Sequence, residues 1–164
     1  SEIVPSNKDR FLRKETLQGF VHDEASAFFG GLAGNAGLFS TARDVARVYQ
    51  MLLNGGEING QRYLSKETCQ LFTTETSKIS RRGLGFDKPD ADDPKKGNCA
   101  PAAPAEVYGH TGFTGTCAWV DPVNELVYVF LSNRIYPDVT NRKLNQLHIR
   151  ERIQGAIYDA MKKK

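Results

Sequence analysis

Residues 114–133 read T-G-T-C-A-W-V-D-P-V-N-E-L-V-Y-V-F-L-S-N and carry the strongest β signal in the chain. Two runs rich in β-branched and aromatic residues, 114–120 and 125–133, flank Asp121-Pro122-Val123-Asn124, which is typical of a type I turn with proline at its second position. The second run is apolar on both faces, so we expect a strand that is covered on both sides. Because an isolated hairpin is only marginally stable, other elements must pack against it.

Outward from this hairpin, the pattern predicts a third strand and two helices. The third strand is expected at G-L-G-F, residues 83–86. Thr41 and Asp44 fit a capping box that begins a helix, and Asn54-Gly55-Gly56 is expected to end it. Ser65 is expected to cap a second helix that runs through Phe72. The residues that this second helix should bury are Cys69, Leu71 and Phe72.

A last amphipathic helix is expected near the C-terminus. Its predicted buried face consists of Ile149, Ile153, Ala156, Ile157 and Ala160, with Arg150, Glu151, Arg152 and Lys162 facing out. Together these elements predict an α/β (α+β) fold in which an antiparallel sheet is flanked by helices. We expect a single domain over residues 1–164, with an irregular, glycine-rich segment at 1–40 and a long polar, proline-punctuated loop at 87–106.

Composition excludes several classes of function. The 22 basic and 19 acidic residues leave a formal charge of +3 without a basic stripe, so no nucleic-acid partner is expected. No apolar run is long enough to span a bilayer, and the start at Ser1 shows neither a signal peptide nor an initiating Met, as expected of an excised piece. Cys69, Cys99 and Cys117 form no C-x-x-C pair; Cys69 and Cys117 are expected to be small core residues.

The segment Y-G-H-T-G-F-T-G-T at 108–116 is the best candidate for chemistry. Glycines weaken a strand unless something must approach its backbone closely. One interpretation is a ligand laid along the strand edge, bound by backbone N–H groups. The alternative is a bulge with a hydrogen-bonded histidine, and spacing alone does not separate the two.

The order of motifs around this segment is distinctive. G-x-x-G-N-A-G-L-F-S-T-A-x-D-V-A-x-x-x-x-M-L-L-N-G-G is followed by N-G-Q-R-Y-L-S-x-E-T, by G-L-G-F, and by G-H-T-G-F-T-G-T with its D-P hairpin. From Arg13 to Met161 the chain resembles the C-terminal half of the serine β-lactamase and penicillin-binding-protein-like family, in the class C β-lactamase and esterase branch. The stretch G-F-V-H-D-E-A-S-A and the closing helix resemble the bacterial branch that is fused to a family 3 glycoside hydrolase, a β-N-acetylglucosaminidase.

The resemblance implies site residues. His110-Thr111-Gly112 matches the family's third motif, K-T-G or H-x-G, on the strand that lines the active site. It implies that the backbone N–H of Phe113 forms half of an oxyanion hole, and that His110 and Thr111 hold the substrate carboxylate or orient the proton-relay tyrosine. Gly112, Thr114 and Gly115 are the implied substrate contacts. The family needs no metal and no cofactor.

The chain also departs from the family pattern. None of its serines has a lysine three positions on, so the S-x-x-K nucleophile motif is absent. Tyr63-Leu64-Ser65 spells Y-x-S but lies where the family begins a helix. Asn35 stands where the family usually has histidine. Without an activated nucleophile, we expect the chain alone to be inert.

Three further groups have other interpretations. His22-Asp23-Glu24 could hold a metal ion, but adjacent residues rarely converge on one ion, so a loop hydrogen-bond cluster is favoured. His110 with Cys117 could suggest a thiol hydrolase, although a thiol in an apolar run is usually inert. Trp119 is expected in the core and not as a carbohydrate platform.

Two hypotheses of function follow. The first is the C-terminal portion of a serine hydrolase, whose Ser, Lys and Tyr lie on a missing N-terminal part, and which acts on a β-lactam, a peptide or an ester. The second is a non-catalytic accessory module of a bacterial cell-wall glycosidase. In either case the resemblance implies a periplasmic or cell-envelope location, and an apolar surface left open by the missing part favours self-association.

Overall fold

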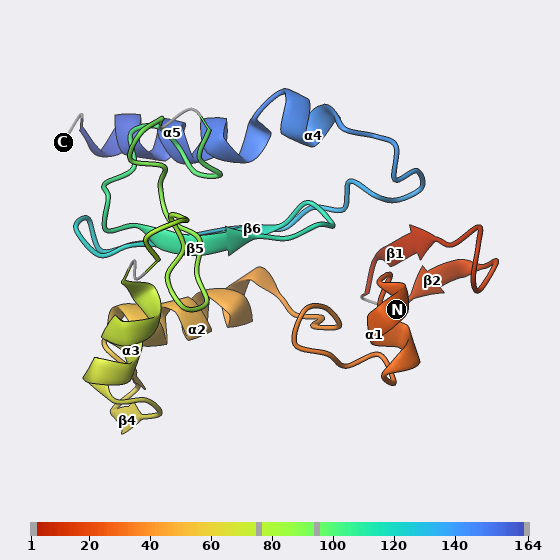
Figure 1. Cartoon of the computed structure of the whole chain (residues 1–164), viewed down its shortest axis with the longest axis horizontal. Coiled ribbons are helices and arrows are strands. Elements are labelled where there is room, and N and C mark those ends of the chain that lie inside the picture. The colour runs from red at the N-terminus through yellow and green to blue at the C-terminus, as the bar shows by residue number, and fades with distance from the viewer. Residues whose placement is uncertain (1–2, 75–76, 94–95, 163–164) are drawn as a thin grey trace.

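The computed structural model describes residues 3–74, 77–93 and 96–162 (Figure 1). Its strands are β1 (Pro5–Lys8), β2 (Thr16–Gln18), β3 (Glu57–Ile58), β4 (Gln61–Arg62), β5 (Tyr108–Thr111), β6 (Cys117–Asp121) and β7 (Leu126–Phe130). Its helices are α1 (Glu24–Phe28), α2 (Ala42–Leu53), α3 (Lys66–Thr73), α4 (Lys143–Gln146) and α5 (Ile149–Met161). In this described part of the chain, no helix is both long and apolar enough to cross a bilayer.

The centre of the molecule is an antiparallel sheet with the strand order β5-β6-β7. Its register pairs His110 with Ala118, and Trp119 with Tyr128. Helix α2 covers one face and α5 the other (Figure 1). The buried core cluster comprises Cys99, Val107, Cys117, Trp119 and Tyr128. The predicted fold class, an antiparallel sheet flanked by helices, is confirmed.

The expected hairpin is present, with strands shorter than predicted. The carboxylate of Asp121 accepts hydrogen bonds from the amides of Val123 (2.9 Å) and Asn124 (3.1 Å), which closes the turn between β6 and β7. Strand β6 begins at Cys117 and not at Thr114, because residues 112–115 form a turn of their own.

The third strand is β5, so the prediction for residues 83–86 is wrong. The amide of Gly83 donates to the carbonyl of Phe86 (3.1 Å), and this contact turns the chain back within four residues. Only the next residue, Asp87, reaches the sheet, through a single antiparallel bridge to Gly109 on the outer edge of β5.

The helix starts agree with the sequence. The Thr41 hydroxyl accepts from the amide of Asp44 (3.2 Å) at the start of α2, and the Ser65 hydroxyl accepts from that of Thr68 (3.1 Å) at the start of α3. Of the three residues that α3 was expected to bury, only Cys69 is buried. The other two, Leu71 and Phe72, are about half exposed.

Helix α5 packs through a different face from the one predicted. Its buried residues are Arg150, Gln154 and Tyr158, whereas Ile153 is exposed. Most of their polar atoms have partners: Gln154 accepts from the Ala100 amide (2.8 Å), the Tyr158 hydroxyl donates to Asp121 (2.9 Å), and Arg150 donates to the Thr116 carbonyl (3.1 Å). Among the described residues, the Nε atom of Arg150 has no hydrogen-bond partner. These hydrogen bonds offset most of the free-energy cost of burying the polar groups. Of the predicted apolar face, only Ile157 packs on the core.

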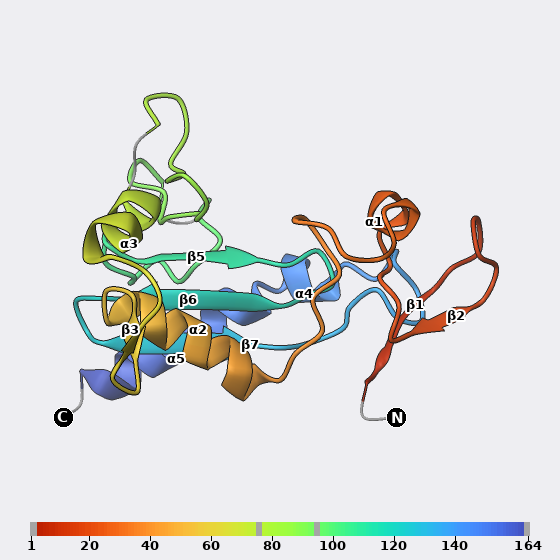
Figure 2. The same cartoon turned by 90° about the horizontal axis from the view of Figure 1, so that it is seen from below.

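The first 40 residues are more ordered than predicted, because β1, β2 and α1 lie there. They form a separate lobe at one end of the sheet (Figure 2). The glycine-rich stretch after α1 contains no helix or strand, as expected of it. Within 87–106, the described residues beyond Asp87 also contain neither, but Cys99 and Ala100 are buried, so this loop forms part of the core.

Candidate functional site

The H-T-G segment lies where β5 ends and the chain turns toward β6. His110 and Thr111 are the last residues of β5. Beyond them, the Gly115 amide donates to the Gly112 carbonyl (3.0 Å) and the Gly112 amide donates to the Thr116 carbonyl (2.8 Å). This pattern is a β-turn over residues 112–115 with Phe113 and Thr114 at its tip.

The backbone N–H of Phe113 is available. Among the described residues, no hydrogen-bond acceptor contacts this amide, because it occupies the second position of the turn. The Phe113 side chain is 60% exposed. A pocket of about 470 Å³ borders Thr111, Gly112 and Phe113. This N–H borders the pocket and can donate a hydrogen bond to a ligand there.

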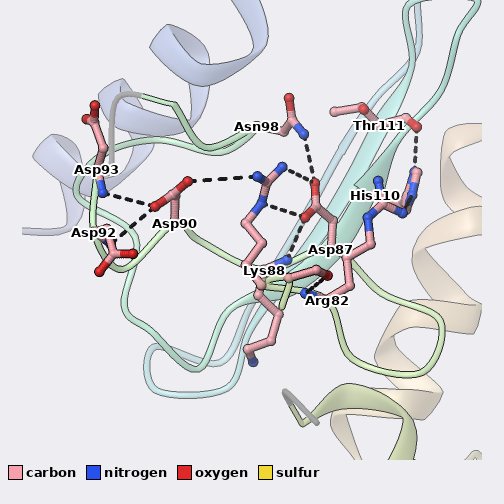
Figure 3. Close-up of polar contacts among 11 residues, drawn as sticks. Arg82, Asp87, Lys88, Asp90, Asp92, Asp93, Asn98, His110 and Thr111 are labelled. Atoms are coloured by element: carbon pink, nitrogen blue, oxygen red, sulfur yellow. Dashed lines mark hydrogen bonds and ion pairs between the residues drawn. The ribbon is translucent and has the colours of Figure 1, made fainter. Parts of the chain in front are cut away.

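His110 is half-buried and held at both ring nitrogens (Figure 3). Its Nε2 lies 2.8 Å from Nη1 of Arg82, and its Nδ1 lies 2.6 Å from the carbonyl oxygen of Thr111. An arginine can only donate, so Nε2 accepts and Nδ1 carries the proton that is donated to Thr111. This arrangement selects the neutral Nδ1–H tautomer of His110.

A buried carboxylate, Asp87, supports β5 from its outer edge. It exchanges backbone hydrogen bonds with Gly109, and its side chain accepts from Arg81 (2.7 and 3.0 Å) and Asn98 (2.7 Å) (Figure 3). Burial alone raises the pKa of Asp87, but these hydrogen bonds and the positive charges of Arg81 and Arg82 outweigh it and lower the pKa below its ordinary value. Asp87 therefore stays ionised.

Sequence reasoning missed this network. Arg81-Arg82 stood out only as a minor basic block, and Asp87 only as the start of a loop. The sequence feature that could have indicated this network is the pair Arg81-Arg82 followed by Asp87, a carboxylate that comes directly after the apolar Phe86.

Close contacts within the protein explain why positions 109 and 112 are glycine. A Cβ on Gly109 would lie 2.1 Å from the Ala118 carbonyl oxygen, and one on Gly112 would lie 2.2 Å from Oγ1 of Thr116. Close approach of the β6 backbone thus requires glycine at position 109. The interpretation that these two glycines make room for a ligand is not needed.

Cationic side chains dominate the pocket beside the turn. Its charged lining residues are Lys96, Arg134, Arg150 and Glu151, with His148 at its border. Burial, together with the nearby positive charges of Arg150 and Arg142, lowers the pKa of Arg134. Like charges that face one cavity favour an anionic ligand such as a carboxylate.

The competing sites have structural explanations. Burial raises the pKa of the Cys117 thiol to about 11, so this residue is not an activated nucleophile. Ser65 is the cap of α3, which agrees with the sequence interpretation. Trp119 is 1% exposed, which confirms the core prediction.

Within the His22-Asp23-Glu24 cluster, the side chains of His22 and Asp23 contact different partners. Asp23 caps α1 by accepting from the amide of Ser26 (2.7 Å), and it also accepts from Asn35 (3.4 Å). The His22 ring instead stacks on Phe113, with ring centroids 5.3 Å apart. Asn35 joins the glycine-rich stretch to α1 through Asp23 and Ser26.

Comparisons with known proteins identify relatives of most of this chain. The Beta-lactamase family model matches residues 5–151. Proteins named "Putative D-alanyl-D-alanine carboxypeptidase" in Escherichia coli (strain K12) and Salmonella typhi are each 37% identical to this chain over 135 residues. The match covers 82% of this chain but 31% of each relative, so the chain spans about a third of the length of these curated relatives.

Proposed function

The chain belongs to the beta-lactamase family, and on that premise we propose that it supplies the H-T-G wall of a serine hydrolase active site. The reaction is acyl transfer: a serine attacks an amide or ester carbonyl, and negative charge develops on the carbonyl oxygen. The observation that carries this proposal is the free amide of Phe113 at the tip of the turn after His110-Thr111-Gly112. Such a donor lowers the barrier by about 3–4 kcal/mol in comparable enzymes.

The nucleophile comes from polypeptide outside this chain. No S-x-x-K occurs among its residues, and the relatives are about three times as long as the segment that they share with it. We propose that the remaining polypeptide brings the serine, the lysine and the tyrosine, and that the chain alone is inert.

The substrate class follows from the pocket and from the relatives. The cationic side chains of Arg134 and Arg150 suit a substrate with a carboxylate next to the scissile bond. The name of the relatives points to peptides that end in D-alanyl-D-alanine. We propose such a cell-wall peptide as substrate, with a β-lactam or a carboxyl ester as a further acyl donor, and a cell-envelope location.

The first prediction concerns acylation. A fluorescent penicillin is expected to leave the isolated chain unlabelled and to label the full-length polypeptide once per molecule. In the full-length protein, Phe113→Pro removes both the N–H and the aromatic ring while fitting the second position of the turn, and it should slow acylation about 10²–10³-fold. Phe113→Leu, which also loses the aromatic ring but keeps the N–H, is the matched control, and its acylation should be slowed only about tenfold.

Two outcomes of this experiment oppose the proposal. Stoichiometric labelling of the isolated chain would show a nucleophile within it. A full-length polypeptide that lacks S-x-x-K and stays unlabelled would instead favour the accessory module of a cell-wall glycosidase, fused to a family 3 glycoside hydrolase.

The second prediction is self-association of the isolated chain. Phe28, Phe29, Leu32 and Leu38 are each more than three-quarters exposed and lie close together in sequence. Apolar patches of more than a few hundred Å² promote association. Sedimentation velocity should show a larger species growing with concentration, and Phe29→Ser with Leu32→Ser should reduce it. A monomer over the whole range from about 10 µM to 1 mM would contradict this prediction.

A further inference from the structure

The exposed turn that carries the Phe113 amide is braced by the N-terminal lobe. The ring of Phe113 stacks on that of His22 at 5.3 Å between centroids and an interplanar angle of 6°. The guanidinium carbon of Arg134 lies 4.6 Å from the centroid of the same Phe113 ring. Both distances are within the range of attractive ring and cation–π contacts. The Phe113 side chain is therefore held although 60% of it is exposed.

Arg134 also holds the turn through its backbone. Its amide donates to the Thr114 carbonyl (2.8 Å), and its guanidinium donates to the carbonyls of Val139 (3.4 Å) and Asn141 (3.5 Å). The residue after Phe113 and the ring of Phe113 are thus fixed by the same arginine.

The backbone at His22 is in turn held by hydrogen bonds from Arg13. Arg13 donates to the carbonyl of Val21 (2.7 Å) and to that of His22 (2.9 Å), and its Nε donates to Asp9 (2.7 Å). Asp9 and Val21 are both buried. A rigid path therefore leads from Asp9 through Arg13 to the imidazole that meets Phe113.

We propose that His22 is a positioning residue: its ring, stacked on Phe113, holds the backbone N–H of Phe113 in the orientation that the oxyanion hole needs. This inference rests on the proposed function for its catalytic consequence, but the stacking and its effect on the turn do not depend on it. The role needs a flat ring, not a proton, so another aromatic ring can replace the imidazole.

The charge state of His22 agrees with this role. Burial is the main cause that lowers its pKa below 6.5; the carboxylates of Asp23 and Glu24 oppose this, and the guanidinium groups of Arg13 and Arg134 reinforce it. The imidazole is therefore neutral at pH 7. It adds no positive charge beside the two arginines.

The test measures the order of the turn in the 164-residue chain by ¹⁵N relaxation. The order parameter of the Phe113 amide is expected near 0.85 in the wild type and below about 0.6 in His22→Ala, with His22→Phe restoring it. Arg13→Gln leaves the ring in place but removes its support and should give an intermediate value. Phe20→Ala is the control and should change nothing, because Phe20 is an exposed aromatic residue of the same lobe that makes no ring contact with any residue the structure describes.

Kinetics of the full-length protein provide the second readout. His22→Ala is expected to slow penicillin acylation about tenfold at saturation, less than the loss of the donor itself, with half-saturation unchanged and the rate restored by His22→Phe. An order parameter that stays high in His22→Ala overturns the inference. If the turn loses order while Phe113→Pro leaves acylation unchanged, the positioning contact stands and the proposed function fails.

Discussion

Replacing Trp119 by alanine is expected to lower the free energy of unfolding by about 3–5 kcal/mol, the range for a buried aromatic side chain cut back to a methyl group. Trp119 lies in the central strand β6, is 1% exposed, and belongs to the cluster with Val107 and Tyr128. It also packs directly against Gly109 of β5. The variant therefore leaves a cavity beside Gly109. Closing this cavity would move Gly109 and the H-T-G segment that follows it.

Urea titration followed by far-ultraviolet circular dichroism measures this effect, because the variant lacks the chain's sole tryptophan as a fluorescence probe. Val123→Ala is the control: Val123 is 59% exposed on the β6–β7 turn and should change stability by less than about 0.5 kcal/mol. A loss below about 1 kcal/mol in Trp119→Ala would contradict the assignment of this residue to the core.

The second large effect is expected from Arg81→Met at neutral pH. Its side chain is 29% exposed and holds the Asp87 carboxylate, which is 1% exposed, through two hydrogen bonds (Figure 3). Removing one partner of a buried pair leaves a charge without compensation and costs about 3–5 kcal/mol. Because Asn98 and the Lys88 amide still bind Asp87, and Arg81 is partly exposed, we expect a loss of about 2–3 kcal/mol.

The stabilisation from the Asp87–Arg81 pair is expected to depend on pH in a defined direction. The folded pKa of Asp87 lies below its unfolded value, so the stabilisation is complete above the unfolded value of about 4 and is lost as the pH falls through the folded pKa. The gap between wild type and Arg81→Met should therefore be largest above about pH 5 and shrink on acidification. Arg47→Met is the control, because its ion pair with Asp44 is exposed and should contribute less than about 1 kcal/mol. A gap that widened toward acid pH would contradict the role of Asp87.

Much of the local structure could be predicted from sequence. The caps at Thr41 and Ser65, the turn at Asp121-Pro122 and the burial of Cys69 and Trp119 all agree with the structure. Each depends on contacts between residues a few positions apart, or on a long apolar run. The sequence also singled out the H-T-G segment, but at the start of a strand, whereas the structure places it at the end of β5; its roles remain predictions.

The errors share a cause. The face of α5 was predicted from apolar spacing, but Gln154 and Tyr158 are buried because Ala100 and Asp121, far away in sequence, offer them hydrogen bonds. The third strand was assigned to residues 83–86, whereas a hydrogen bond across that segment closes a turn. The spacing of apolar residues gives no information about hydrogen-bond partners that are distant in sequence or that lie across a turn.

The sequence by itself determined the helix starts, the β6–β7 hairpin, the family resemblance and the absence of a serine nucleophile motif, because these depend on residue order and on neighbours along the chain. Only the tertiary structure decided the Asp87–Arg81 support of β5, the tautomer of His110 and the stack of His22 on Phe113. Those contacts join residues 6, 28 and 91 positions apart. The packing of the sheet against its loops brings these partners together, and the spacing of apolar and polar residues along the chain does not identify them.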